Sequence, residues 1–190
     1  MRAEPGVQHL DDAGQLRAPR VDLVHAAHGS PGGRSKSYKT WWGALSDDSG
    51  TNEPLRFATK IAVLLRDDLP VWQRLNVTAF LVSGLATARP ELLGEPYRDG
   101  GDITYLPMFG QPVLVFEGGK ETLTAVHGRA LSRDVQLSIF TSDLFATGND
   151  VDNRAAVRAV PTALLDLVGL AVHGPRVAVD KILKGAAMHR

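Results

Sequence analysis

Residues 166–185 have the sequence DLVGLAVHGPRVAVDKILKG. The apolar run Leu165–His173 predicts a buried strand, Gly174-Pro175 predicts a turn, and Pro175 favours the start of a short closing helix. A second informative stretch begins at Lys60, where KIAVLL is the continuous apolar run expected of a strand covered on both faces. Together these stretches indicate a fold built on buried strands.

Between the two stretches, strand and helix patterns alternate. Apolar residues recur at helical spacing from Val71 to about Ala86, and we expect this stripe to face the core. The stripe consists of Val71, Trp72, Leu75, Ala79, Val82 and Ala86. Further strands are expected at 112–116 and 135–140, further helices at 119–130 and 151–160, and a loop-like segment at 91–111. This alternation predicts an α/β fold in which helices cover both faces of a largely parallel or mixed sheet.

Composition limits the class of protein. The 190 residues are 44% hydrophobic, enough for an ordinary core, and the 21 Lys and Arg balance the 21 Asp and Glu. Nucleic-acid binders usually carry a basic excess, so this balance argues against such a partner. The absence of cysteine excludes disulfides and thiolate chemistry. No apolar run approaches the roughly 18–20 residues of a membrane span, so we expect a soluble, cytoplasmic protein without a membrane partner.

Composition also changes near residue 58. We predict that residues 1–57 form a largely loop-like extension, with Val21–His25 as an alternative edge strand, and that residues 58–190 form the folded domain. Trp41 and Trp42 are expected to dock on this domain or on a partner chain. The basic and aromatic residues around them also fit single-stranded nucleic acid, which keeps tRNA as an alternative partner.

Three segments carry a family resemblance: 60–81, 94–115 and 145–154. With the C-terminal stretch, they resemble a bacterial family catalogued as domain-of-unknown-function family two thousand, over roughly residues 58–188. That family in turn resembles the type 2, archaeal and eukaryotic-type, peptidyl-tRNA hydrolases. The matching motifs are Asp68-Leu69 after the first strand, His173-Gly174-Pro175 at the last turn, and Asp180-Lys181 in the last helix. The resemblance implies a three-layer α/β/α sandwich around a small mixed sheet, and a homodimer.

The same resemblance implies hydrolysis of an aminoacyl or acyl ester, with an acidic residue after the third strand matched by Asp143. Two other positions of the hydrolases differ here. Their lysine at the start of the first helix is absent, with Arg74 as a stand-in, and their threonine before the last strand meets Leu165-Asp166. One of three catalytic positions is therefore clearly matched.

Two polar clusters are candidates for chemistry. Asn76 and Thr78 interrupt an apolar helix and would face a pocket at the carboxyl ends of the strands, unless Thr78 bonds back to the preceding turn and Asn76 faces solvent. The second cluster follows the third strand and contains Thr147, Asn149, Asn153 and Arg154. Its hydroxyl and amide groups and the paired N–H donors of the Arg154 guanidinium would orient a carboxylate or phosphate. The alternative is that Asp150 or Asp152 merely caps the next helix.

The leading hypothesis is an enzyme acting on an aminoacyl or acyl ester, or on a small molecule, at the strand carboxyl ends. The residues expected to act in catalysis are Asp143, Asn76 and Thr78, and those expected to bind the ligand are Thr147, Asn149, Asn153, Arg154 and Arg74. The rival hypothesis is a non-catalytic ligand-binding or dimerisation module. His127 and His173 are further acid/base candidates. No cofactor is expected, and no metal, because His25 and His28 lack a carboxylate partner.

Overall fold

The structure is a computed structural model that describes residues 56–189. The predictions for Val21–His25, for His25 and His28, and for Trp41 and Trp42 with their basic neighbours lie outside the described residues. None of the helices between residues 56 and 189 is long and apolar enough to cross a membrane.

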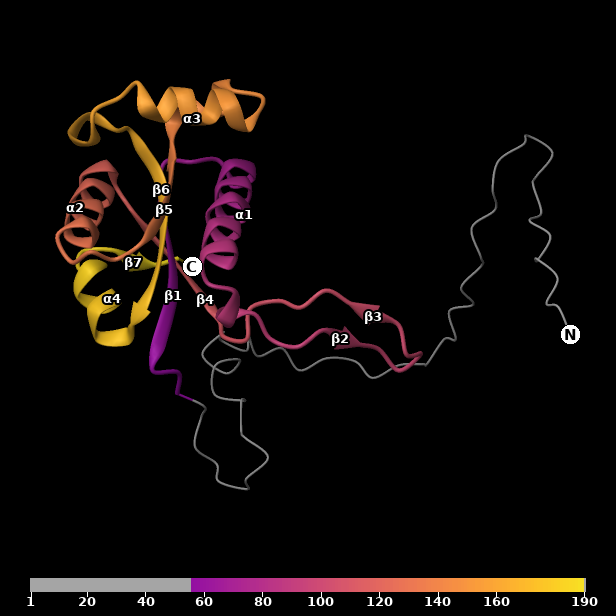
Figure 1. The fold of residues 1–190 in the computed structure, drawn as a ribbon. Coiled ribbons are helices and arrows are strands. Elements are labelled where there is room, and N and C mark those ends of the chain that lie inside the picture. Colours follow the sequence, from indigo (N-terminus) through magenta and orange to yellow (C-terminus); the bar gives the residue numbers. More distant parts are fainter. Residues whose placement is uncertain (1–55, 190) are drawn as a thin grey trace, which may run out of the picture. The chain divides into compact units, whose positions relative to one another are not determined.

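In this part of the chain, five strands form one mixed sheet in the order β5-β6-β1-β4-β7 (Figure 1). The central strand β1 (Thr59–Arg66) runs parallel to β4 (Val113–Gly118) and antiparallel to β6 (Leu167–Pro175). At the edges, β5 (Leu137–Thr141) pairs antiparallel with β6, and β7 (Ala187–Met188) pairs antiparallel with β4. The predicted α/β fold with a small mixed sheet is confirmed.

Helices cover both faces of the sheet. One face carries α1 (Val71–Ala88), and the other carries α2 (Lys120–Leu131) and α4 (Arg176–Ile182) (Figure 1). The helix α3 (Asp150–Arg158) follows the 3-10 turn η3 (Ser142–Ala146) and lies beyond the end of β5.

The alternation of β1 side chains explains the two apolar layers. Ile61 and Val63 are fully buried against the α1 side, whereas Ala62 and Leu64 are fully buried against α2 and α4. Successive strand residues point to opposite faces, so a strand covered on both sides must be apolar throughout. This is why the run at Lys60 predicted the strand correctly.

The stripe predicted for α1 is wrong in its orientation. The buried residues of α1 are Val77, Leu81 and Leu85, at helical spacing, while Trp72 is 62% exposed and Leu75 is 68% exposed. Both faces of the helix carry apolar residues, so periodicity alone did not select the correct one. The exposed face contributes to the groove described below.

The segment 91–111, expected to be loop-like, differs from that expectation. After the short turn η2 (Pro90–Leu92), it forms a hairpin that projects from the body, with β2 (Tyr97–Arg98) paired to β3 (Thr104–Tyr105) (Figure 1). The Asp99 carboxylate stabilises the tip, since it accepts hydrogen bonds from backbone N–H groups across the turn. One further 3-10 turn, η4 (Thr162–Leu164), precedes β6.

Candidate functional site

A groove of about 420 Å³ opens between α1 and the segment that follows β5. We call it the α1–α3 groove. It is lined by Trp72, Asn76, Phe80, Phe140, Leu144, Phe145, Thr147, Gly148, Asn149, Asp150 and Asn153. The groove lies at the carboxyl end of β5, the end of a strand where ligands commonly bind in open α/β sheets.

Aromatic rings form one wall of this groove. Phe145 contacts Trp72 edge to face with ring centroids 6.0 Å apart, and it packs against Phe140 at 5.1 Å. Phe140 in turn meets Phe80 at 5.7 Å. Phe140 is buried, but Trp72 and Phe80 are 62% and 53% exposed. Two large aromatic side chains thus keep much of their apolar surface in water beside a hollow.

Polar groups from the 147–153 segment form the opposite wall. The Thr147 hydroxyl donates to the Leu144 carbonyl at 2.9 Å and is hydrogen-bonded to the Asn153 side chain. Asn149 is the N-cap of α3, because its side-chain oxygen accepts from the Asp152 backbone N–H at 3.0 Å. The alternative that Asp150 or Asp152 caps this helix is therefore wrong, and Asn149 holds the start of α3 over the groove.

A second opening of about 370 Å³ continues from the groove between α3 and β5. It shares Phe80, Phe140, Leu144, Asp150 and Asn153 with the groove, and adds Ile139, Arg154, Val157 and Arg158. The Arg154 guanidinium is 3.0 Å from the Asp150 carboxylate, and both side chains are about three-quarters exposed. Such a surface pair is weak, so the Arg154 fork is open to other acceptors.

Three of the residues singled out from the sequence line neither opening. Arg74 donates to the Leu69 carbonyl at 2.8 Å and to the Glu117 carboxylate at 3.1 Å, which fastens the β1–α1 loop to β4. Thr78 bonds back to the Arg74 carbonyl at 2.7 Å, the structural alternative considered above. Asp143 is exposed in η3.

The carboxyl ends of β1 and β4 are closed by ion pairs. Asp166 accepts from Lys120 at 2.8 Å and from Arg66 at 3.0 Å. The hydrogen bond from Lys120, together with Ser142 and Arg66, lowers the pKa of Asp166 to about 2 despite its partial burial. These charges are paired with one another.

Glu117 completes this closed end of the sheet. Its carboxylate lies 3.1 Å from Arg74 and 3.1 Å from the imidazole Nδ1 of His189. His189 also donates its backbone N–H to the Val115 carbonyl at 3.0 Å, which holds the end of the chain along β4.

The two histidines named as acid/base candidates lie away from the groove. His127 on α2 is 8% exposed, and burial lowers its pKa. His173 lines a separate, smaller pocket at the opposite end of β5. Within residues 56–189, no three His, Asp or Glu side chains are grouped so as to hold a metal ion.

Comparison with known proteins identifies the family. The model of the family described as "Protein of unknown function (DUF2000)" matches residues 59–190. The chain belongs to the DUF2000 family. A solved structure, that of the protein of unknown function Atu0240 from Agrobacterium tumefaciens strain C58, is 47% identical with a TM-score of 0.69. The match covers 71% of this chain and 100% of that one. None of the curated proteins compared matches the chain.

In this DUF2000 domain, the structure brings together Asn76, Thr147, Asn149 and Asn153 in one groove, with Arg154 in the adjoining opening. Their roles in binding or catalysis stay predictions. The sequence pattern did not point to the aromatic wall, whose members are Trp72, Phe80, Phe140 and Phe145. The sequence does carry one signal, because Phe80 falls outside the stripe expected to be buried, and a large aromatic side chain off the core face needs another partner.

Proposed function

We propose that this DUF2000 domain binds a small organic molecule in the α1–α3 groove. The observation that carries the proposal is the exposure of Trp72 and Phe80 beside a hollow of about 420 Å³. Ligand sites are typically concave, about 300–1,000 Å³ in volume, and largely apolar with a few converging polar groups. The groove fits each part of that description.

The two walls indicate the kind of ligand. A flat, apolar group would lie against the Trp72 and Phe80 rings. Asn76 and Asn153 present amide groups, each able to donate and to accept hydrogen bonds. The charge of Asp150 is offset by Arg154. The ligand that complements this groove is therefore an aromatic molecule carrying an amide-like substituent.

Ester hydrolysis has less support as the function of this groove. The acid expected to orient water, Asp143, lines neither opening, and Arg74 is engaged by Glu117 rather than directed at the groove. The binding function, the rival hypothesis from the sequence, is therefore the one we adopt. Homodimer formation and tRNA binding stay predictions.

We also propose that the fold is of the peptidyl-tRNA hydrolase type 2 kind. The support is the strand–turn–helix at the end of the chain, where β6 ends at Gly174-Pro175 and leads directly into α4. Further support comes from the pairing of this last long strand beside β1, which carries Asp68-Leu69 just beyond its end.

The proposal is tested by NMR titration of the full chain with benzamide, nicotinamide and indole as probes. We expect shifts of the Trp72 indole N–H and the Asn153 side-chain amide, with dissociation constants in the millimolar range, about −4 kcal/mol. Trp72→Ala should weaken binding at least tenfold. Leu75→Ala is the matched control, since Leu75 is equally exposed on α1 but does not line the groove.

Absence of any shift at the groove residues with all three probes would contradict the binding function. A separate assay decides between binding and catalysis. We expect no turnover of p-nitrophenyl acetate or of an aminoacyl-tRNA beyond the rate of an Asp143→Asn variant. Turnover that is lost in this variant would instead favour the hydrolase.

A further inference from the structure

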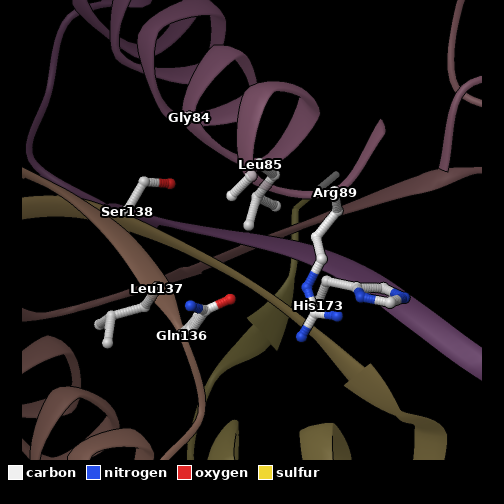
Figure 2. Close-up of a pocket in the computed structure, with 8 residues that line it drawn as sticks. Gly84, Leu85, Arg89, Gln136, Leu137, Ser138 and His173 are labelled. Atoms are coloured by element: carbon white, nitrogen blue, oxygen red, sulfur yellow. The ribbon is translucent and has the colours of Figure 1, made fainter. Parts of the chain in front are cut away.

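A second pocket lies at the opposite end of β5 from the α1–α3 groove, between that strand and the C-terminal end of α1 (Figure 2). We call it the His173 pocket, and its volume is about 140 Å³. It is lined by Gly84, Leu85, Ala88, Arg89, Gln136, Leu137, Ser138 and His173. It shares no residue with the α1–α3 groove, and its function is independent of the proposed one.

One end of this pocket is polar and the rest is apolar. In Figure 2 the guanidinium of Arg89 lies between the amide of Gln136 and the imidazole of His173, while Leu85 and Leu137 supply aliphatic surface. The Ser138 hydroxyl is already used, because it donates to the Leu81 carbonyl at 2.7 Å. Because the ring nitrogens of His173 are shielded from solvent, Arg89 and Gln136 are the groups available to a ligand that enters.

Arg89 is only weakly held. Its carboxylate contact is with Glu91, at 3.5 Å, and the two side chains are 42% and 60% exposed. An exposed ion pair at this distance contributes little and is easily exchanged. The guanidinium fork can thus turn to another carboxylate, for which its paired N–H donors have the matching geometry.

His173 is unusual in its lack of partners. Within residues 56–189, neither ring nitrogen has a hydrogen-bond partner, and both nitrogens are shielded from solvent. Burial lowers the pKa of His173, the positive charge of Arg89 lowers it further, and Glu91 opposes the shift. The neutral His173 imidazole carries no negative charge, so it does not compensate the positive charge of Arg89 on the pocket side.

We propose that the His173 pocket binds a small carboxylate. The carboxylate lies on the Arg89 guanidinium and the Gln136 amide, and its short aliphatic part packs against Leu85 and Leu137. The anion compensates the charge of Arg89, whose only carboxylate contact within residues 56–189 is the one with Glu91 at 3.5 Å. The carbonyl groups at the end of α1 oppose a negative charge, so the affinity is in the millimolar range.

The size of the pocket limits the ligand. A cavity of about 150 Å³ in another protein holds one benzene molecule, so about 140 Å³ suits a ligand of roughly six non-hydrogen atoms. Acetate and butyrate meet this limit. Benzoate exceeds it.

The experiment follows the imidazole signals of His173 by NMR while sodium butyrate is added to the full chain at constant ionic strength, with sodium chloride as the reference salt. We expect saturable shifts and a rise in the pKa of His173, because the bound anion offsets the charge of Arg89. Acetate should act similarly, whereas butanol and benzoate should have no effect. Arg89→Gln should weaken butyrate binding at least tenfold.

Arg98→Gln is the matched control, because Arg98 is also exposed and paired at 3.6 Å with one carboxylate, that of Asp102 on the hairpin. This control should bind butyrate as the native chain does. The proposal is overturned if butyrate leaves the His173 signals and pKa unchanged. It is also overturned if Arg89→Gln responds like the native chain, or if butanol binds as well as butyrate.

Discussion

The carboxyl ends of β1 and β4 differ from the carboxyl end of β5, although both belong to the same sheet. At β1 and β4, charged side chains are paired, as in Asp166 with Lys120 and Arg66. At β5, the side chains are mostly neutral, and Trp72 and Phe80 stay exposed beside a groove. The first region contributes stability, and the second offers surface to a ligand.

This difference refines a general expectation. Ligands of open α/β sheets bind at the carboxyl ends of strands, but that expectation does not say which strands. Here the strand end that can bind a ligand is the one whose polar side chains are not already engaged in ion pairs. Arg74 was a binding candidate by position, but its donors are taken by Glu117 and by backbone carbonyls. The polar groups beside β5 surround an open hollow instead.

Among variants of the side chains at the two strand ends, the largest effect is expected at the closed end. Glu117→Ala should lower the free energy of unfolding by about 2 kcal/mol, because it leaves the Arg74 guanidinium, only 19% exposed, without its carboxylate. Chemical denaturation of the variant measures this loss. The double variant Arg74→Met, Glu117→Leu removes both charges and should recover at least half of it. If Glu117→Ala is as stable as the native chain, the ion pairs do not hold this end together.

A smaller effect is expected at Asp166, and it depends on pH. The pKa of Asp166 is lowered to about 2 in the folded state, so its stabilisation is complete above the ordinary carboxyl pKa and is lost as the pH falls through 2. Allowing for solvent screening of a side chain that is one-third exposed, we expect about 1 kcal/mol. Asp166→Asn should cost this amount at pH 7.

Denaturation of Asp166→Asn and the native chain across pH 2 to 7 checks the sign. The difference in stability between them should shrink steadily below about pH 4. A difference that stays constant with pH would show that the carboxylate is not the source of the stabilisation.

The smallest effect on stability is expected in the groove. Phe80→Ala should cost only about 0.5–1 kcal/mol, since Phe80 is 53% exposed and keeps one edge contact with Phe140. The neighbouring Leu81→Ala, at a position 1% exposed, should cost about 2–5 kcal/mol. Thermal denaturation compares the two. If both variants lose the same free energy of unfolding, Phe80 belongs to the core. The proposed difference between the carboxyl end of β5 and those of β1 and β4 would then be wrong.

The sequence predicted the long elements well because each carries its own signal. The apolar run from Lys60 predicted β1, and the run ending at His173 predicted β6. The short elements β2, β3 and β7 have two residues each, which is too few for any periodicity to be recognised. β2 and β3 form only by pairing with each other across a turn, and β7 forms only by pairing with β4, which is distant in the chain.

The candidate site was predicted in part. Asn76, Thr147, Asn149 and Asn153 were singled out as polar residues near strand ends, and the structure groups them. The aromatic wall was not predicted. Trp72 fell in the stripe expected to face the core, because an aromatic residue at helical spacing has the same appearance whether it faces the core or a groove. Only the packing of Val77 and Leu81 against the sheet fixes the rotation of α1, and hence the exposure of Trp72.

The central position of β1 has a consequence for synthesis of the protein. β1 is the first strand of the described domain to leave the ribosome, yet one of its two neighbours, β6, is the last long strand, and Ile61 pairs with His173. Until β6 emerges, one edge of a strand whose central run 61–65 is apolar stays unpaired in the nascent chain. The sheet of this domain is therefore completed only after β6 has been made, and until then the unpaired edge of β1 is open to a chaperone.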